Sequence, residues 1–203
     1  MKKLTALLAL LLVGVLGLAG CGNDDTSNTS GDTSTAQFND ADVQFAQGMI
    51  PHHQQAVQMS RMAETHTASP AVTKLASDIE AAQGPEIDTM TQWLRDWGKD
   101  VPSASGSDMG DMGDMDMGDG SHMDTGDMPG MMSDDALDEL DQAHGGHWDR
   151  MFLTMMIRHH EGAIEMARTE QTDGENPDAV ALAKKIEAAQ TAEIATMKHM
   201  LES

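Results

Sequence analysis

One segment occurs twice in the sequence. Residues 42–94 align without a gap to residues 149–201, and each copy places two adjacent histidines between methionines, in "MIPHHQQAVQM" and again in "MIRHHEGAIEM". Apolar residues recur in each copy at three- and four-residue intervals over two stretches, and the second stretch begins with Pro70 or Pro177. A proline directly after a capping Ser or Asn is typical of a helix start. Each copy therefore predicts two helices joined by a short connection.

A single helical hairpin can bury only one face, so we expect the two copies to pack against each other. This predicts an all-α protein, a four-helix bundle whose halves are related by an approximate twofold axis. Three Phe, three Trp and no Tyr leave a core of Ala, Ile, Leu and Met, which suits helices better than a sheet. A short extra helix should start near Ser133. The alternative is that each hairpin pairs with another chain, and the sequence leaves the oligomeric state open.

Residues 1–20 have the pattern of a secretory signal peptide, with two lysines, an apolar run and small residues. The alternative is a membrane-spanning helix, but the run is shorter than the roughly 20 residues that such a helix needs. Cys21, the only cysteine, follows in "LAGC", which resembles the lipobox of bacterial lipoproteins. This implies that lipid on Cys21 anchors the mature chain to a bacterial membrane, outside the cytoplasm. The alternative for Cys21 is a free thiol in a secreted protein.

The remaining chain divides by composition. Residues after Cys21 are polar and lack an apolar period, which predicts a flexible tether. The predicted segments are the signal peptide 1–20, the tether 21–37, the first hairpin 38–98, a linker 99–132, and the short helix with the second hairpin 133–203. The two hairpins should form one domain.

The linker is unusual because it is rich in methionine. Eight of the 19 methionines lie between residues 109 and 132, among aspartates and glycines and without a lysine or arginine. Its composition predicts disorder, but solvated linkers do not normally collect methionine. We interpret it as a low-affinity metal collector, and the alternative is an acidic spacer. Its candidate ligands are Met109, Met112, Met115, Met117, His122, Met123, Met128, Met131 and Met132.

The histidine pairs of the repeat should face the bundle interior. At about 100° per residue, both histidines of a pair fall in one arc with the methionines beside them, and a glutamate lies on the inward stripe of the following helix. A buried carboxylate needs a donor or a cation, so we expect each glutamate to meet a histidine. Such pairs could also be a polar network that binds nothing. The candidate metal ligands are His52, His53, Met49, Met59, His159, His160, Met156, Met166, Glu86 and Glu193.

The segments "NDADVQFAQGMIPHHQQAVQMSRMA" and "HWDRMFLTMMIRHHEGAIEMA", each followed by the pattern "IEAAQ..EI.TM", resemble the domain-of-unknown-function family 305. The resemblance covers nearly all of the mature domain, twice. It implies a ferritin-like helical bundle in a bacterial secreted or lipid-anchored protein, and copper binding, which some members show. It carries His52, His53, Met59, His159, His160 and Met166 over as the positions of interest.

These features favour an extracytoplasmic, membrane-anchored protein that sequesters or hands on copper. Thioether sulfur selects Cu(I) and imidazole serves several transition metals, so Cu(I) is the favoured ion and other transition metals are possible. The formal net charge of −22 favours cations as partners and argues against nucleic acid. A copper-handling protein could be a further partner.

Two other functions stay open. One is an enzyme in which Glu86, Glu193 and the histidines hold a dinuclear iron, manganese or copper site. Di-iron bundles usually carry Glu-x-x-His motifs, which this sequence lacks, and no catalytic residue is identified, so we favour a binding protein over an enzyme. The other is a purely structural bundle.

Overall fold

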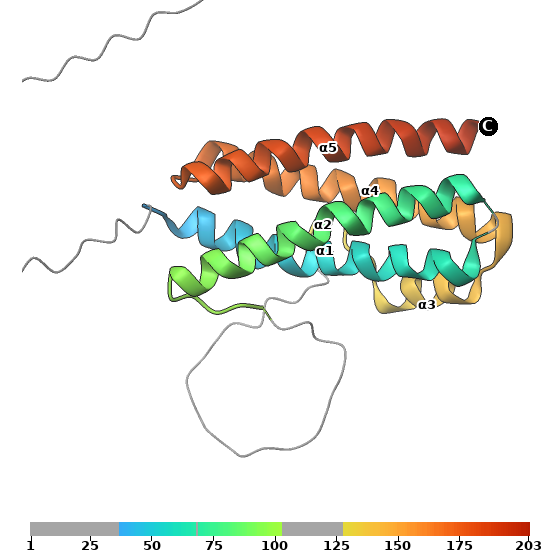
Figure 1. Cartoon of the computed structure of the whole chain (residues 1–203), viewed down its shortest axis with the longest axis horizontal. Coiled ribbons are helices and arrows are strands. Elements are labelled where there is room, and N and C mark those ends of the chain that lie inside the picture. The colour runs from blue at the N-terminus through green and yellow to red at the C-terminus, as the bar shows by residue number, and fades with distance from the viewer. Residues whose placement is uncertain (1–36, 68, 103–127) are drawn as a thin grey trace, which may run out of the picture. The chain divides into compact units, whose positions relative to one another are not determined.

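The structure, a computed structural model, describes residues 37–67, 69–102 and 128–203. These residues form five α-helices and no strand (Figure 1). The helices are α1 (Asp40–His66), α2 (Pro70–Asp96), α3 (Asp134–Gln142), α4 (Gly145–Asp173) and α5 (Pro177–Glu202). The all-α prediction is confirmed. The predicted signal peptide, Cys21, nearly all of the tether and the linker methionines from Met109 to Met123 lie outside the described residues.

The helices begin where the sequence supplies caps. The side chain of Asn39 accepts hydrogen bonds from the backbone N–H groups of Ala41 and Asp42, and Asp42 accepts one from the N–H of Asn39 at 2.6 Å, which is a reciprocal capping box. The side chain of Asn176 caps α5 by accepting hydrogen bonds from the N–H groups of Asp178 and Ala179, and Pro177 follows in the first turn. Asp42 also accepts from the N–H of Asn176 at 2.9 Å. The start of α1 is therefore tied to the start of α5.

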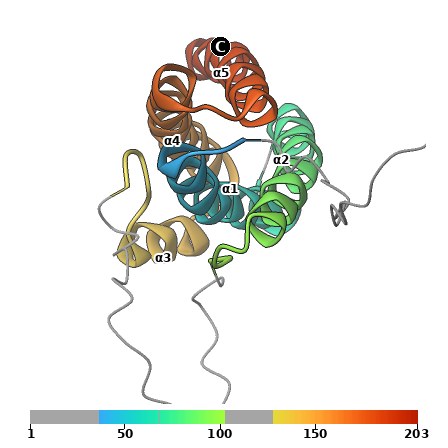
Figure 2. The same cartoon turned by 90° about the vertical axis from the view of Figure 1, so that its left-hand side faces the viewer.

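Two hairpins pack through their first helices. α1 contacts α2, α4 contacts α5, and α1 and α4 contact each other between them (Figures 1 and 2). α3 lies against α1 and α4. This is the predicted four-helix bundle with one short added helix. Among the described helices, none is long and apolar enough to cross a membrane.

The core consists of two apolar clusters. One cluster includes Phe45, Met49 and Ile50, and the other includes Met59 and Phe152. Along α1, residues 52 and 53 fall between members of the two clusters. Along α4, residues 159 and 160 do the same, because Met156 belongs to one cluster and Ala163 to the other. The four histidines of the repeat therefore lie where the clusters meet.

Candidate metal centre

All four histidines of the repeat are buried, with exposed fractions of 0% for His52, His53 and His160 and 1% for His159. Adjacent residues point about 100° apart on a helix, so complete burial of both residues of a pair requires packing over a wide arc of the helix surface. α1 is covered on two sides, by α2 and α4, and α4 is covered by α1 and α5. Both residues of each pair are therefore inside the bundle.

The two pairs share one interior. The rings of His52 on α1 and His159 on α4 lie with their centroids 3.8 Å apart, although they come from different hairpins. The ring centroids of His159 and His160 are 6.4 Å apart. The duplicated motif thus brings imidazoles from both halves of the bundle together at the contact between α1 and α4.

The other two imidazoles are each held by a glutamate. His53 Nε2 lies 3.0 Å from a carboxylate oxygen of Glu86 on α2, and His160 Nε2 lies 2.7 Å from one of Glu193 on α5. These are the histidine–glutamate contacts that the sequence predicts. Glu86 also pairs with Lys185 of α5, at 3.2 Å. Lys185 is a participant that the sequence did not indicate, because no matching charge occurs in the first copy, where the equivalent residue is Asp78.

The free nitrogens of this cluster are its main chemical feature. Within the described part of the chain, Nδ1 of all four histidines is buried and has no hydrogen-bond partner. The Nε2 atoms of His53 and His160 face carboxylates, and that of His52 faces the backbone oxygen of Pro129 at 3.0 Å. An acceptor at Nε2 requires the proton there, so Nδ1 carries a lone pair in these three rings. Unpaired lone pairs are costly in a core, and they are also what a metal ion binds.

The surroundings favour the neutral form of His52, His53 and His159. Burial, followed by the charge of His53, lowers the pKa of His52 to about 3. Burial and the charges of the other three histidines hold the pKa of His159 well below its ordinary value, although the backbone oxygen of His52 opposes the shift. Burial lowers the pKa of His53 in spite of its bond to Glu86. Neutral imidazole is the form that binds metals, so no proton has to leave these rings first.

Glu86 stays ionised beside them. Burial alone would raise the pKa of Glu86, but the hydrogen bonds from His53 and Lys185, with the charge of Lys185, outweigh it and leave the pKa below the ordinary value. A carboxylate that accepts from one nitrogen of an imidazole fixes the ring and its tautomer, as the outer-sphere partners of metal-bound histidines do. Glu86 and Glu193 are therefore placed to orient His53 and His160.

The candidate methionines differ in burial and in whether the structure describes them. Met49, Met59 and Met156 are fully buried members of the two apolar clusters, so they pack the core on either side of the histidines. Met166 is half-buried. Of the linker candidates, Met128, Met131 and Met132 are described, and Met132 is buried with its backbone bound to the side chain of Gln55. The candidates from Met109 to Met123, including His122, lie outside the described residues.

The arrangement limits the type of metal site. In the part of the chain that the structure describes, no three His, Cys, Asp or Glu side chains are grouped so that they could hold one ion. The dinuclear, carboxylate-rich centre of the enzyme hypothesis needs such a group. A site of two imidazoles and thioether sulfurs does not need three such side chains. Neutral nitrogen and sulfur donors suit a soft ion.

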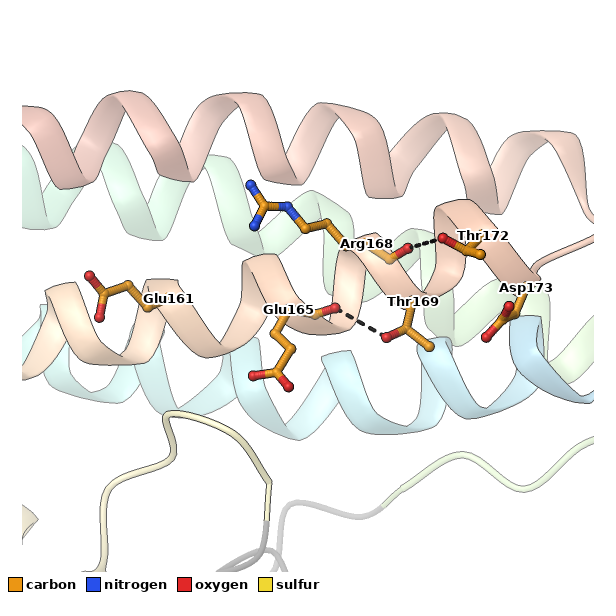
Figure 3. Close-up of a pocket in the computed structure, with 6 residues that line it drawn as sticks. All are labelled: Glu161, Glu165, Arg168, Thr169, Thr172 and Asp173. Atoms are coloured by element: carbon orange, nitrogen blue, oxygen red, sulfur yellow. Dashed lines mark hydrogen bonds between the residues drawn. The ribbon is translucent and has the colours of Figure 1, made fainter.

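A surface pocket on α4 is a separate feature. Figure 3 shows the residues that line it, which are Glu161, Glu165, Arg168, Thr169, Thr172 and Asp173. The two threonine hydroxyls bond to carbonyl oxygens of their own helix, and the Arg168 side chain bonds to Glu187 at 2.7 Å. None of the four buried histidines lines this pocket, so it is not part of the candidate metal centre.

Solved structures of other proteins share this bundle. A DUF305 protein from Streptomyces coelicolor, described as secreted, matches with 30% identity and a TM-score of 0.64, over 80% of this chain and 92% of that chain. The Cu(II)-bound form of CopM matches with 34% identity and a TM-score of 0.61, over 79% of this chain and 95% of that chain. A DUF305 fragment from Deinococcus radiodurans matches with 28% identity and a TM-score of 0.66, over 81% and 97% of the two chains. CopM structures with Cu(I) and with silver are also similar.

Two comparisons of sequence complete the assignment. A stretch of 53 residues, 26% of this chain, is 42% identical to the uncharacterized protein L153 of Acanthamoeba polyphaga mimivirus, and it spans 35% of that relative. The family model of the domain of unknown function DUF305 matches residues 42–201, which contain both copies of the repeat. This agrees with the resemblance seen in the histidine motifs. The chain belongs to the DUF305 family.

Proposed function

We propose that this protein binds a soft metal ion, with Cu(I) as the favoured cargo, and holds it outside the cytoplasm for storage or transfer. The observation that carries the proposal is the set of four buried Nδ1 atoms without partners, at the contact between α1 and α4. In three of these rings the other nitrogen already has an acceptor. Four buried ring nitrogens without partners among the described residues support a ligand rather than packing alone.

His52 and His159 are the imidazoles that we place at the centre of the site. Their rings are 3.8 Å apart and neither is bound to a carboxylate. His53 and His160, each held by a glutamate, would support the central pair from its surroundings. The donor set of neutral nitrogen and sulfur fits Cu(I) and Ag(I), whereas hard cations such as Mg²⁺ prefer oxygen ligands. Support also comes from CopM, whose similar structures contain Cu(II), Cu(I) or silver.

The proposed location and linker role rest on sequence. A location at the outer face of a membrane is supported by the signal-peptide pattern and by the lipobox-like sequence at Cys21, and a relative of similar fold is described as secreted. In this setting thioethers are useful ligands because they are less easily lost to disulfide exchange than thiolates. The acidic, methionine-rich linker would collect the ion at low affinity, and the bundle would hold it more firmly.

The test is an anaerobic Cu(I) titration of the mature protein against a competing chromophoric chelator. The variant H52Q/H159Q removes the central pair and leaves both histidine–glutamate pairs intact. We expect its affinity at the tightest site to fall by at least about a hundredfold, since even outer-sphere partners contribute about 10–100-fold. H199Q is the matched control, because His199 is exposed on α5. Unchanged affinity in the folded double variant would refute the proposal and leave the structural bundle as the better explanation.

A further inference from the structure

The end of the linker is part of the bundle. We call residues 128–132 the strap. The backbone oxygen of Pro129 accepts a hydrogen bond from His52 at 3.0 Å. The side chain of Gln55 binds the backbone of Met132 in both directions, through Nε2 to the carbonyl oxygen at 2.9 Å and through Oε1 to the N–H at 2.8 Å. The strap is therefore attached to α1 beside the candidate metal centre.

The repeat has diverged at one position to accommodate the strap. Gln55 in the first copy corresponds to Gly162 in the second. A Cβ atom on Gly162 would overlap the carbonyl group of Pro129 and come within 2.8 Å of the Cα of Gly130. The first copy thus has a glutamine whose amide holds the strap. The second copy has a glycine, and because it lacks a side chain the strap can approach α4.

The strap also brings a methionine of the linker to a methionine of the bundle. Around the position that a Cβ on Gly48 would occupy, the terminal methyl of Met166 lies at 2.9 Å and the sulfur of Met128 at 3.8 Å. Both side chains are half-buried, so solvent reaches them. The residue equivalent to Gly48 in the second copy is Met155, so this space is a feature of one half of the repeat.

Helical spacing places an imidazole one turn from this position. His52 follows Gly48 by four residues, which places it one helical turn farther along the same face of α1. Pro129, whose oxygen binds His52, is the residue directly after Met128. Methionine side chains have three rotatable bonds, so their sulfurs can close on an ion with little rearrangement of the backbone. Two neutral thioethers and one neutral imidazole form a donor set for a soft cation.

We propose that Met128, Met166 and His52 form a junction site for one soft monovalent ion, Cu(I) or Ag(I), shared by the linker and the bundle. This inference rests on the proposed function and specifies where the cargo enters the core. The ion exchanges ligands without a change in oxidation state, first between thioethers of the linker and then toward His159, whose ring is 3.8 Å from that of His52. Met128 belongs to this site rather than to a separate collector.

Two variants of the full mature chain test the junction site in different ways. M128L removes one sulfur. G48A keeps every sulfur, but its methyl group must push the end of Met166 away from the position beside Met128. Because alanine favours a helix more than glycine does, and because the displaced atom is the end of a flexible side chain, G48A should keep the fold. M151L is the matched control, because Met151 is a half-buried methionine of α4 that is not a candidate ligand.

The readouts are anaerobic Cu(I) competition and NMR of ¹³C-labelled methionine methyls during addition of Ag(I). At one equivalent, we expect the Met128 and Met166 methyl signals to shift and that of Met151 to stay. Affinity at the tightest site should fall by at least about tenfold in M128L and in G48A, and not in M151L. If wild-type protein binds and both variants bind equally well, the junction site is wrong. If wild-type protein binds no Cu(I), the proposed function itself fails.

Discussion

Glu170 gives a prediction with a defined sign and size. It is 1% exposed near the end of α4, and it replaces the buried Ala63 of the first copy. Burial, followed by the neighbouring carboxylate of Asp42 and the charge of Asp173, raises the pKa of Glu170 from 4.5 to about 8. Asp42 already accepts backbone N–H groups of Asn39 and Asn176, so its carboxylate is committed to the helix starts. The proton therefore stays on Glu170 in the folded state.

The consequence follows from proton linkage. The unfolded chain releases this proton near pH 4.5, and the folded chain keeps it up to about pH 8. The free energy of unfolding should therefore fall as the pH rises between these values, at about 1.4 kcal/mol per pH unit, or roughly 3–5 kcal/mol in all. E170Q mimics the protonated form and removes this dependence. Near pH 5 it should match the wild type, and near pH 8 it should be more stable by roughly 3–5 kcal/mol.

Urea unfolding of both proteins near pH 5, 6.5 and 8 measures the difference. E165Q is the control, because Glu165 is an exposed glutamate on the same helix, and its effect should be small at every pH. If the stability difference between E170Q and wild type is the same near pH 5 and near pH 8, Glu170 does not hold its proton and the assignment is refuted.

Three further predictions concern the centre and the strap. As the pH falls from 6.5 toward 3, the unfolded chain gains a proton at His52 that the folded chain does not take up, so stability should fall in acid, and H52Q should reduce that slope in urea unfolding. Q55A leaves the Met132 backbone without its buried partners and should cost about 1–3 kcal/mol, whereas Q58A, an exposed glutamine, should cost little. G162A places a methyl group against the Pro129 backbone, so hydrogen exchange at Gly130–Met132 should accelerate and Cu(I) affinity should fall; unchanged exchange would contradict the described strap.

The helices and the histidine–glutamate contacts were predictable because they depend on local patterns. Pro70 and Pro177 mark the starts of α2 and α5, and Ser133 caps α3. The inward position of Glu86 follows from helical periodicity, and its need for a donor follows from burial. The same periodicity placed both histidines of each pair in one inward arc, but their complete burial depends on neighbours on two sides of α1 and α4, which the pattern does not identify.

The strap and Glu170 were harder to predict for a different reason. Both depend on long-range contacts of residues that break the repeat. A comparison of the two copies does contain a signal, since Gln55 with Gly162, and Ala63 with Glu170, are unlike residues at equivalent positions. These differences show where the two copies depart from symmetry, but they do not identify the distant segment that each residue contacts. The composition of the linker likewise indicated metal binding but not that Met128 would lie beside Met166.

Symmetric and asymmetric positions therefore have different roles in this bundle. Two copies of one hairpin give two histidine–glutamate pairs and bring His52 against His159, which creates an interior with neutral nitrogen donors from both halves. A strictly symmetric bundle would offer two equivalent routes to that interior. Gly48 and Gly162 make the two sides unequal, because a methionine pair and the strap occupy space that side chains there would fill. Since the strap is the end of the methionine-rich linker, the proposed function predicts that an ion reaches the core from one side only.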